Sequence, residues 1–204
     1  MVSLKSTDEL RQRKMDSRIK AVVFNEEEHT YLYNGKRLKG VTGAICRLMN
    51  KSFPQTDTVK LATLYGSDVH KEVENYYNSK SGLLSTDSAK WVVKTLEDFS
   101  KDNCKDSRTE CEVMVSDFEG TASKVDVVMH DTKGNAFLFD IKTTSHFDRP
   151  YCSLQLSIYK RLFEENYGEE VKGMFVLATK AKRLFHILEQ DKNKVDKILL
   201  ENKS

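Results

Sequence analysis

The stretch Phe137-Leu138-Phe139-Asp140-Ile141-Lys142-Thr143-Thr144 is the part of the chain from which the rest is best interpreted. Its first residues are apolar and aromatic, and the run is short, which predicts a buried strand. Residues two apart on a strand point to the same face, so Asp140 and Lys142 are expected side by side. A buried carboxylate and ammonium are costly unless they pair or hold a metal. Taken alone, this D-x-K is most simply a salt-bridged strand end.

Composition sets the broad class of protein. With 204 residues, 39% of them hydrophobic and 31% charged, the chain can form one soluble domain with its own core. The net charge of +2 does not by itself indicate nucleic-acid binding, so any phosphate-binding surface must come from local clusters. No apolar run approaches the roughly 18 residues of a membrane span, and the polar first 20 residues do not resemble a secretory signal.

These features predict a protein without a membrane segment. We expect it in the cytoplasm of a bacterium or phage-infected cell, or in the nucleus or an organelle of a eukaryote. The four cysteines, of which Cys152 is the last, show no C-x-x-C spacing, which indicates reduced thiols rather than a zinc site.

Hydrophobic periodicity predicts an α/β fold with a mixed central sheet flanked by helices. Residues 1–18 are expected to form a flexible or weakly helical arm, and residues 19–204 a single domain. Near the N-terminus we expect two strands, at residues 21–24 and 29–33, the second followed by the hairpin signal Asn34-Gly35. A short helix capped near Thr42 is expected after them. Further helices are expected near 57–77, 85–101, 151–167 and 192–201, and strands near 110–116, 123–130, 135–142, 171–179 and 184–188.

Acidic residues recur on the three consecutive predicted strands. Asp126 is expected at the end of a valine-flanked strand, fourteen residues before Asp140, and Glu112 lies fourteen residues before Asp126. Neighbouring strands lie about 4.8 Å apart, so these acids can meet at one edge of the sheet. Clustered carboxylates repel one another unless a cation neutralises them, and oxygen ligands favour Mg²⁺ or Mn²⁺. Glu110, two residues from Glu112, stays open as the alternative third acid.

Two helical patterns accompany the acids. His70 follows Gly66 in the first long helix, where a glycine costs about 1 kcal/mol relative to alanine. The close approach of another backbone would explain that glycine. Gln155 and Tyr159 are four residues apart, so they share one face of the helix after the D-x-K strand.

The ordered set of His70, Asp126, the D-x-K of Asp140 and Lys142, and the Q-x-x-x-Y of Gln155 and Tyr159 resembles the PD-(D/E)xK nuclease superfamily. Within it, the set is similar to the RecB-like branch that includes phage exonucleases, over roughly residues 19 to 180. The resemblance implies a restriction-endonuclease-like core.

The same resemblance implies the roles of the site residues. Metal would be held by Asp126, Asp140, the Ile141 carbonyl, and Glu112 or His70. Lys142 would act with the acids in catalysis by orienting or activating a water. Gln155 and Tyr159 would contact DNA or position Lys142.

Two features depart from the family pattern. The glycine that often precedes the metal-binding aspartate is replaced here by Ala122-Ser123-Lys124-Val125. Iron–sulfur members of the branch carry further cysteines beyond the Q-x-x-x-Y helix, whereas this chain has none after Cys152. We therefore expect Mg²⁺ or Mn²⁺ and no iron–sulfur cluster.

The sequence therefore predicts a metal-dependent deoxyribonuclease, and the resemblance favours an exonuclease of recombination, repair or phage DNA metabolism. Its expected partners are single- or double-stranded DNA ends and a recombination or replication protein, and an oligomer stays open. A structure- or sequence-directed endonuclease, a non-catalytic DNA-binding protein, and a plain α/β protein with a salt-bridged strand end are the alternatives.

Overall fold

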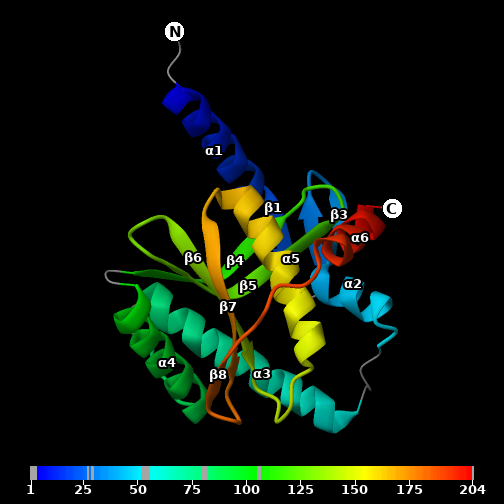
Figure 1. The fold of residues 1–204 in the computed structure, drawn as a ribbon. Coiled ribbons are helices and arrows are strands. Elements are labelled where there is room, and N and C mark those ends of the chain that lie inside the picture. Colours follow the sequence, from blue (N-terminus) through cyan, green and yellow to red (C-terminus); the bar gives the residue numbers. More distant parts are fainter. Residues whose placement is uncertain are drawn as a thin grey trace.

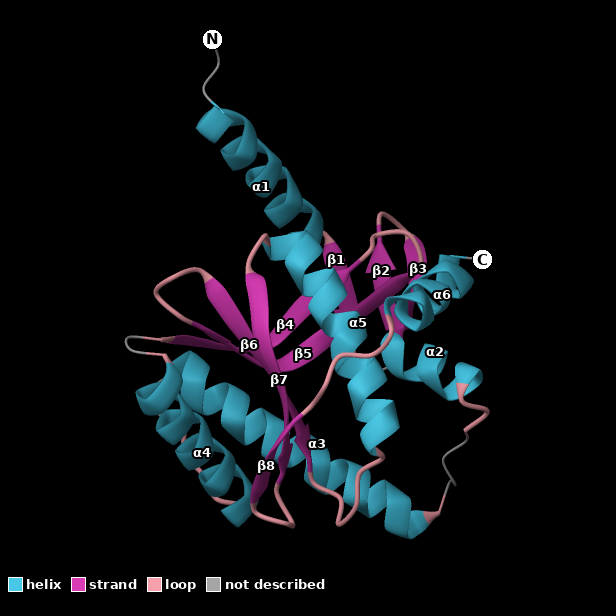
Figure 2. Ribbon diagram, viewed as in Figure 1, coloured by secondary structure: helices cyan, strands magenta, loops and turns pink. Residues whose placement is uncertain are grey.

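The computed structural model describes residues 4–26, 28, 30–51, 56–79, 82–104 and 107–203. It is a mixed α/β fold, which confirms the predicted class (Figures 1 and 2). The elements, in chain order, are α1 (Leu4–Lys20), β1 (Val22–Asn25), β2 (Thr30–Tyr33), β3 (Lys36–Gly40), α2 (Val41–Leu48), α3 (Asp57–Ser79), α4 (Asp87–Asn103), β4 (Arg108–Ser116), β5 (Thr121–His130), β6 (Asn135–Lys142), α5 (Arg149–Tyr167), β7 (Glu170–Ala178), β8 (Arg183–His186) and α6 (Lys192–Lys203).

The eight-stranded sheet has the order β1-β2-β3-β5-β6-β7-β8, with β4 paired to β5 outside that path. Strand β4 runs antiparallel to β5 over most of its length. Two different strands share the remaining edge of β5. Parallel β3 pairs with residues 121–122, whereas antiparallel β6 pairs with residues 127–130. Residues 123–126 of β5 therefore lie in a split between two neighbouring strands.

Helices cover both faces of this sheet. Helix α5 packs on one face through Leu156, Ile158 and Leu162, which join the largest hydrophobic cluster. Helices α3 and α4 pack on the other face, where Val69 and Leu96 contact the second cluster (Figure 2). Because strand residues alternate between the two faces, both clusters are built from the same central strands.

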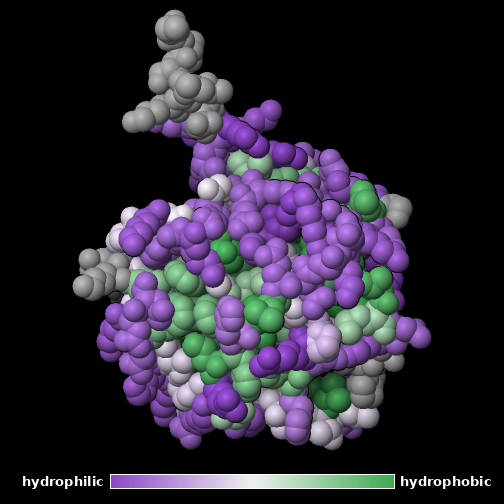
Figure 3. All heavy atoms as spheres, viewed as in Figure 1, coloured by the Kyte–Doolittle hydropathy of each residue, from purple (hydrophilic) through white to green (hydrophobic). Residues whose placement is uncertain are grey.

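Helix α5 has a clear start and stop. The Asp148 side chain accepts a hydrogen bond from Tyr151 N at 2.9 Å, and Pro150 occupies the first turn. At the other end Gly168 adopts φ 72°, a left-handed conformation that glycine tolerates. In Figure 3 the surface in the upper part of the view, over α1 and the C-terminal end of α5, is mostly hydrophilic, while hydrophobic residues gather lower in the view.

Residues 4–20 form helix α1, whose N-terminal end extends away from the body of the protein (Figure 1). Its second half packs on the domain. Gln12 Nε2 donates to the Asn166 carbonyl at 3.2 Å, and the Arg18 guanidinium lies 4.0 Å from the centre of the Phe118 ring. The arm predicted over residues 1–18 is thus helical and partly anchored where it is described.

Several local predictions were wrong. Helix α2 starts after Gly40 without a side-chain cap, so Thr42 is not its N-cap. A Cβ on Gly66 would lie 3.1 Å from Thr143 Oγ1, so a side chain, not a backbone, accounts for this glycine. Asp126 lies inside β5 rather than at its end. Residue 29, predicted within the second strand, lies outside the described residues.

Among the described residues, every helix falls short of the length and apolar character that crossing a bilayer requires.

Candidate metal centre

Strands β4 and β5 place Glu112 and Asp126 opposite each other. Cys111 pairs with Val127 and Val113 pairs with Val125, so the register is the same before and after Glu112 and Asp126. Glu112 and Asp126 themselves are not paired in the ladder. Glu112 has φ 53°, a left-handed conformation that costs a non-glycine residue about 1–2 kcal/mol. Strain of this kind persists only where surrounding structure imposes it, often at functional sites.

The same pair interrupts the alternation of side chains. Val113 and Val125 pack in the cluster under α5, whereas Cys111 and Val127 pack in the cluster under α3 and α4. In a regular strand, residues two apart would share one face. In both strands, the alternation of side chains between the two faces of the sheet therefore shifts by one residue at Glu112 and Asp126. The two carboxylates lie together at this irregularity.

Helix α3 brings His70 to these acids. Atoms of His70, Glu112 and Asp126 lie within 4.8 Å of one another. His70 Nδ1 is 3.7 Å from Asp126 Oδ1 and 4.0 Å from Glu112 Oε1. The helix is held in place by Val69, which is fully buried one residue earlier, and by Gly66, which lets α3 approach Thr143.

The hydrogen bond on the other ring nitrogen defines the role of His70. Nε2 lies 3.2 Å from the carbonyl oxygen of Ile141, and a carbonyl can only accept, so Nε2 carries the hydrogen. In the neutral imidazole, Nδ1 then presents a lone pair toward the carboxylates of Glu112 and Asp126. Three acceptors that face one another without a donor favour a cation between them. The Ile141 carbonyl keeps its second lone pair, while its side chain is buried in the core.

The pKa values of the two acids also favour a bound cation. Burial, together with the neighbouring Asp126, raises the pKa of Glu112 despite the opposing charges of Lys124 and of His70 when its imidazole is protonated. Burial and Asp140 likewise raise the pKa of Asp126, although a protonated His70, Lys142 and the Ile141 N–H oppose the shift. Ionisation of both carboxyl groups is therefore unfavourable in the metal-free protein, and a divalent ion bound between them would favour it.

Asp140 and Lys142 form a pair next to this group. Lys142 Nζ lies 2.8 Å from both carboxylate oxygens and donates its hydrogen bond to Oδ1. Asp140 is only 2% exposed, and its Oδ2 is buried without a hydrogen-bond partner. Asp126 reaches across the split in the sheet, where its Oδ2 accepts from Ile141 N at 2.7 Å. The D-x-K end of β6 is thus joined directly to the acid of β5.

Gln155 and Tyr159 extend from Lys142 as a buried hydrogen-bonded chain. Lys142 Nζ donates to Gln155 Oε1 at 3.4 Å, and Gln155 Nε2 donates to Tyr159 Oη at 2.9 Å. Tyr159 Oη lies 3.1 Å from Ser123 Oγ, and Tyr31 also hydrogen-bonds Ser123. Burial raises the pKa of Tyr31 to about 12 and also raises that of Tyr159, so both hydroxyls remain protonated.

The structure groups Glu112, and not Glu110, with His70 and Asp126. Glu110 pairs with Arg108 at 2.5 Å and lies 4.0 Å from His130 Nε2. Sequence reasoning missed Lys124, whose Nζ is 3.6 Å from Glu112 Oε2, and the continuation of the hydrogen-bonded chain to Ser123 and Tyr31. The spacing of Lys124, two residues before Asp126 on a strand, was the available signal.

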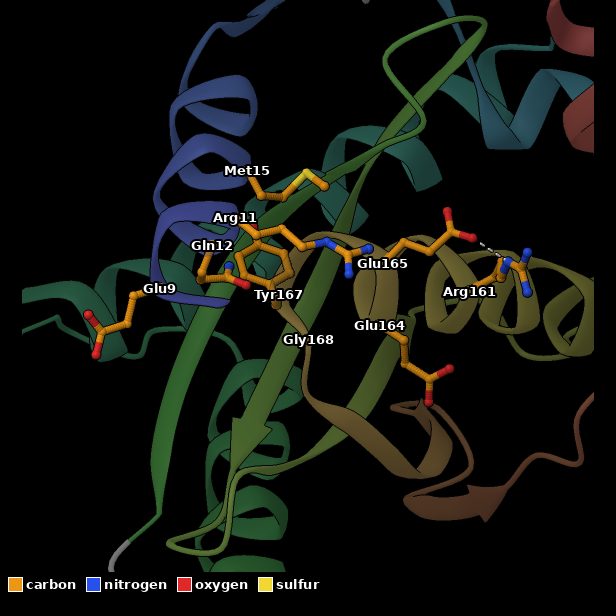
Figure 4. Close-up of a pocket in the computed structure, with 9 residues that line it drawn as sticks. All are labelled: Glu9, Arg11, Gln12, Met15, Arg161, Glu164, Glu165, Tyr167 and Gly168. Atoms are coloured by element: carbon orange, nitrogen blue, oxygen red, sulfur yellow. Dashed lines mark ion pairs between the residues drawn. The ribbon is translucent and has the colours of Figure 1, made fainter. Parts of the chain in front are cut away.

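A groove of about 770 Å³ lies elsewhere, between α1 and the C-terminal end of α5 (Figure 4). Its lining includes Arg11, Met15, Tyr167 and the ion pair of Arg161 with Glu165 at 2.6 Å. Exposed charged side chains on two helices dominate it, and it contains none of the metal-site candidates. The candidate site is therefore the polar cluster in the sheet, where carboxylates and an imidazole converge.

Comparisons with known proteins provide no family assignment. No protein-family model and no curated protein matches this sequence. A solved structure titled "Crystal structure of SSO0001" is similar at 17% sequence identity and a TM-score of 0.40, over 97% of this chain and 85% of that chain. The site is therefore interpreted from its own geometry.

Glu112 yields a prediction that separates charge from backbone strain. A carboxyl group whose pKa is higher in the folded than in the unfolded protein destabilises the fold once it is ionised. The cost is absent below its unfolded pKa of about 4.3 and develops as pH rises through the folded value. We expect metal-free Glu112→Gln to be more stable than the wild type at pH 8 and equal to it at pH 4. Glu112→Gly should gain about 1 kcal/mol more at both pH values by relieving the left-handed strain.

Urea unfolding of the three proteins at both pH values, with a chelator present, measures these differences. A Glu112→Gln variant less stable than the wild type at pH 8 would show that the carboxylate is a structural ion-pair partner.

Proposed function

We propose that this protein is a Mg²⁺- or Mn²⁺-dependent deoxyribonuclease with a PD-(D/E)xK, restriction-endonuclease-like core of the RecB-like type. One observation carries the proposal. A helical histidine and acids from two adjacent strands converge within 4.8 Å, directly beside a buried aspartate–lysine pair at the end of a third strand. That arrangement combines a hard-cation site with a fixed ammonium group, and both can stabilise the negative charge that develops during phosphodiester hydrolysis.

The residues present fit such an ion. Glu112 and Asp126 offer carboxylate oxygens and His70 offers Nδ1. Asp140, whose carboxylate is ion-paired with Lys142, is a further candidate ligand beside this group. The Ile141 carbonyl is a further candidate ligand. A bound divalent ion would neutralise charge on the phosphate and assist the ionisation of water.

Lys142 is best suited to act as a charged donor rather than as a base. Burial lowers its pKa, but the negative charges of Asp140 and Asp126 outweigh burial and raise it. The ammonium therefore keeps its proton, and can donate a hydrogen bond to a phosphate oxygen or orient the attacking water. Asp140 and Gln155 fix its position.

Tyr159→Phe tests whether the buried chain positions Lys142. The change removes the hydroxyl that accepts from Gln155 and contacts Ser123, so Gln155 and then Lys142 lose a fixed orientation. We expect turnover to fall about tenfold while Mn²⁺ affinity stays unchanged, because second-sphere partners typically contribute 10- to 100-fold. Tyr167→Phe, which removes a hydrogen bond to the Met114 carbonyl, is the matched control and should keep full turnover.

Measuring the free energy of unfolding of both variants separates a loss of turnover from a loss of stability. Each phenylalanine variant should lose about 1 kcal/mol. Equal losses of turnover in both variants would indicate a general loss of stability and would contradict a positioning role for Tyr159.

The activity itself is tested on linear, nicked and closed circular DNA with Mg²⁺ or Mn²⁺, using end-labelled single and double strands. We expect linear DNA to be degraded from its ends and closed circles to survive, which is the exonuclease form of the proposal. Nicking of closed circles would instead support an endonuclease. Absence of both cleavage and Mn²⁺ binding by calorimetry would reject the nuclease and favour a DNA-binding or purely structural role.

The biological setting is proposed from the same resemblance. An exonuclease of this type would act in recombination, repair or phage DNA metabolism, with DNA ends as substrate and a recombination or replication protein as partner.

A further inference from the structure

Lys124 is held between an aromatic ring and a candidate metal ligand. Its Nζ lies 3.6 Å from Glu112 Oε2 and 4.5 Å from the centre of the Phe24 ring. Phe24 in turn packs against Tyr31, with ring centres 4.7 Å apart. The Lys124 side chain remains 25% exposed, so its ammonium group is restrained but still accessible to a ligand from solution.

The position of Lys124 follows from the split in the sheet. It lies within residues 123–126 of β5, between the ends of β3 and β6. Its charge therefore borders the metal centre on the side of Glu112, whereas Lys142 borders it on the side of Asp140. Two ammonium groups thus flank the candidate metal ligands.

The charges of this group match a phosphodiester once a divalent ion is present. Glu112, Asp126 and Asp140 are three carboxylates, and Lys124 and Lys142 are two ammonium groups. With His70 neutral and the acids ionised, the group carries one net negative charge. A divalent ion changes it to one net positive charge, equal and opposite to the charge of a phosphodiester.

On the basis of the proposed nuclease function, we propose that Lys124 is a second phosphate-binding residue that exchanges partners. In the metal-free protein it pairs with Glu112. When Glu112 binds the divalent ion, that carboxylate attracts the ammonium less strongly, and Lys124 contacts a phosphate oxygen of the DNA. The Phe24 ring keeps the ammonium at the site through a cation–π contact during the exchange.

This role predicts effects of opposite sign on metal and on DNA. Lys124 competes with the ion for Glu112 and repels it, so Lys124→Met should bind Mn²⁺ roughly three- to tenfold more tightly in the absence of DNA. The same variant loses one phosphate contact, so its DNA affinity should fall. The slope of log DNA affinity against log salt concentration should also become less steep, by about 0.7–0.9. Lys124→Arg keeps the charge and should resemble the wild type in both measurements.

The experiment uses the full chain. Calorimetry measures Mn²⁺ binding, and fluorescence anisotropy measures DNA binding across a salt series with Ca²⁺ in place of the catalytic ion, the DNA being checked for cleavage. Lys172→Met is the matched control, because Lys172 is also a strand lysine paired with a glutamate, Glu170 at 2.6 Å, on β7. It should leave Mn²⁺ affinity and the salt slope unchanged.

The outcomes separate this inference from the proposed function. Tighter Mn²⁺ binding with a shallower salt slope in Lys124→Met supports the partner exchange. If the wild type binds Mn²⁺ and cuts DNA while Lys124→Met is unchanged or binds Mn²⁺ more weakly, only the role of Lys124 is overturned. A wild type that neither binds Mn²⁺ nor cuts DNA overturns both proposals.

Discussion

Asp126→Asn is expected to abolish Mn²⁺ binding and to lower DNA cleavage on the order of a thousandfold, while making the metal-free protein more stable at neutral pH. The asparagine oxygen can still accept the hydrogen bond from Ile141 N, so the connection across the split sheet survives. What is lost is the negative charge between His70 and Asp140. Removing a charge required by the metal site therefore tests function with little disturbance of the fold.

The gain in stability follows from the raised pKa of Asp126. Burial and Asp140 make its ionisation less favourable in the folded than in the unfolded protein. This cost is absent below the unfolded pKa of about 3.9 and grows as pH rises through the folded value. The stability difference between Asp126→Asn and the wild type should therefore grow from acidic to neutral pH when a chelator is present.

Added metal should reverse the order of stability. Mn²⁺ at a hundred times its dissociation constant would stabilise the wild type by about 2.7 kcal/mol, whereas Asp126→Asn should gain almost nothing. Urea unfolding with and without Mn²⁺ measures both effects. Asp131→Asn is the matched control, because Asp131 also accepts backbone hydrogen bonds but does so at a turn away from the site. An Asp126→Asn variant that cuts DNA normally would remove Asp126 from the mechanism.

Lys142→Met carries the second large expected effect. Cleavage should fall at least a hundredfold, because the ammonium next to the scissile phosphate is lost. Mn²⁺ binding should persist, because the His70, Glu112 and Asp126 group remains intact. Loss of cleavage without loss of metal would distinguish Lys142 from the metal ligands.

Stability should respond to Lys142→Met as well. Asp140, 2% exposed, would remain as a buried carboxylate without its partner, a change that typically costs 3–5 kcal/mol. Partial exposure of Lys142 places the expected loss near the lower end, at about 3 kcal/mol. The double variant Asp140→Asn/Lys142→Met should recover most of this stability and none of the cleavage. Recovery of cleavage in the double variant would mean that Lys142 only supports the fold.

Local pattern was sufficient to predict most elements and the fold class. The alternation and length of the apolar runs placed the strands near their observed bounds, including β6 at Asn135–Lys142. Helical spacing likewise placed His70 on α3 and the Gln155–Tyr159 pair on α5. These features depend on residues close in sequence, so they could be predicted without the tertiary structure.

The choice between Glu110 and Glu112 could not be made in this way. Regular alternation puts both side chains on one face, yet the left-handed φ of Glu112 turns it away from the direction of Glu110. That conformation coincides with the interruption of pairing opposite Asp126, and a residue's own sequence neighbours do not encode it. The partner of Lys124 was unpredictable for the same reason.

The sequence by itself determined which side chains are available, namely three acids on consecutive strands, a helical histidine and a lysine two residues after Asp140. Only the tertiary structure decided which of them meet. Strands β3 and β6 share one edge of β5, and the split between them lets Asp126 reach Ile141. Glu112 on β4 and His70 on α3 meet the same aspartate from other elements. Where two strands end along a third depends on packing between distant segments, so local periodicity does not determine it.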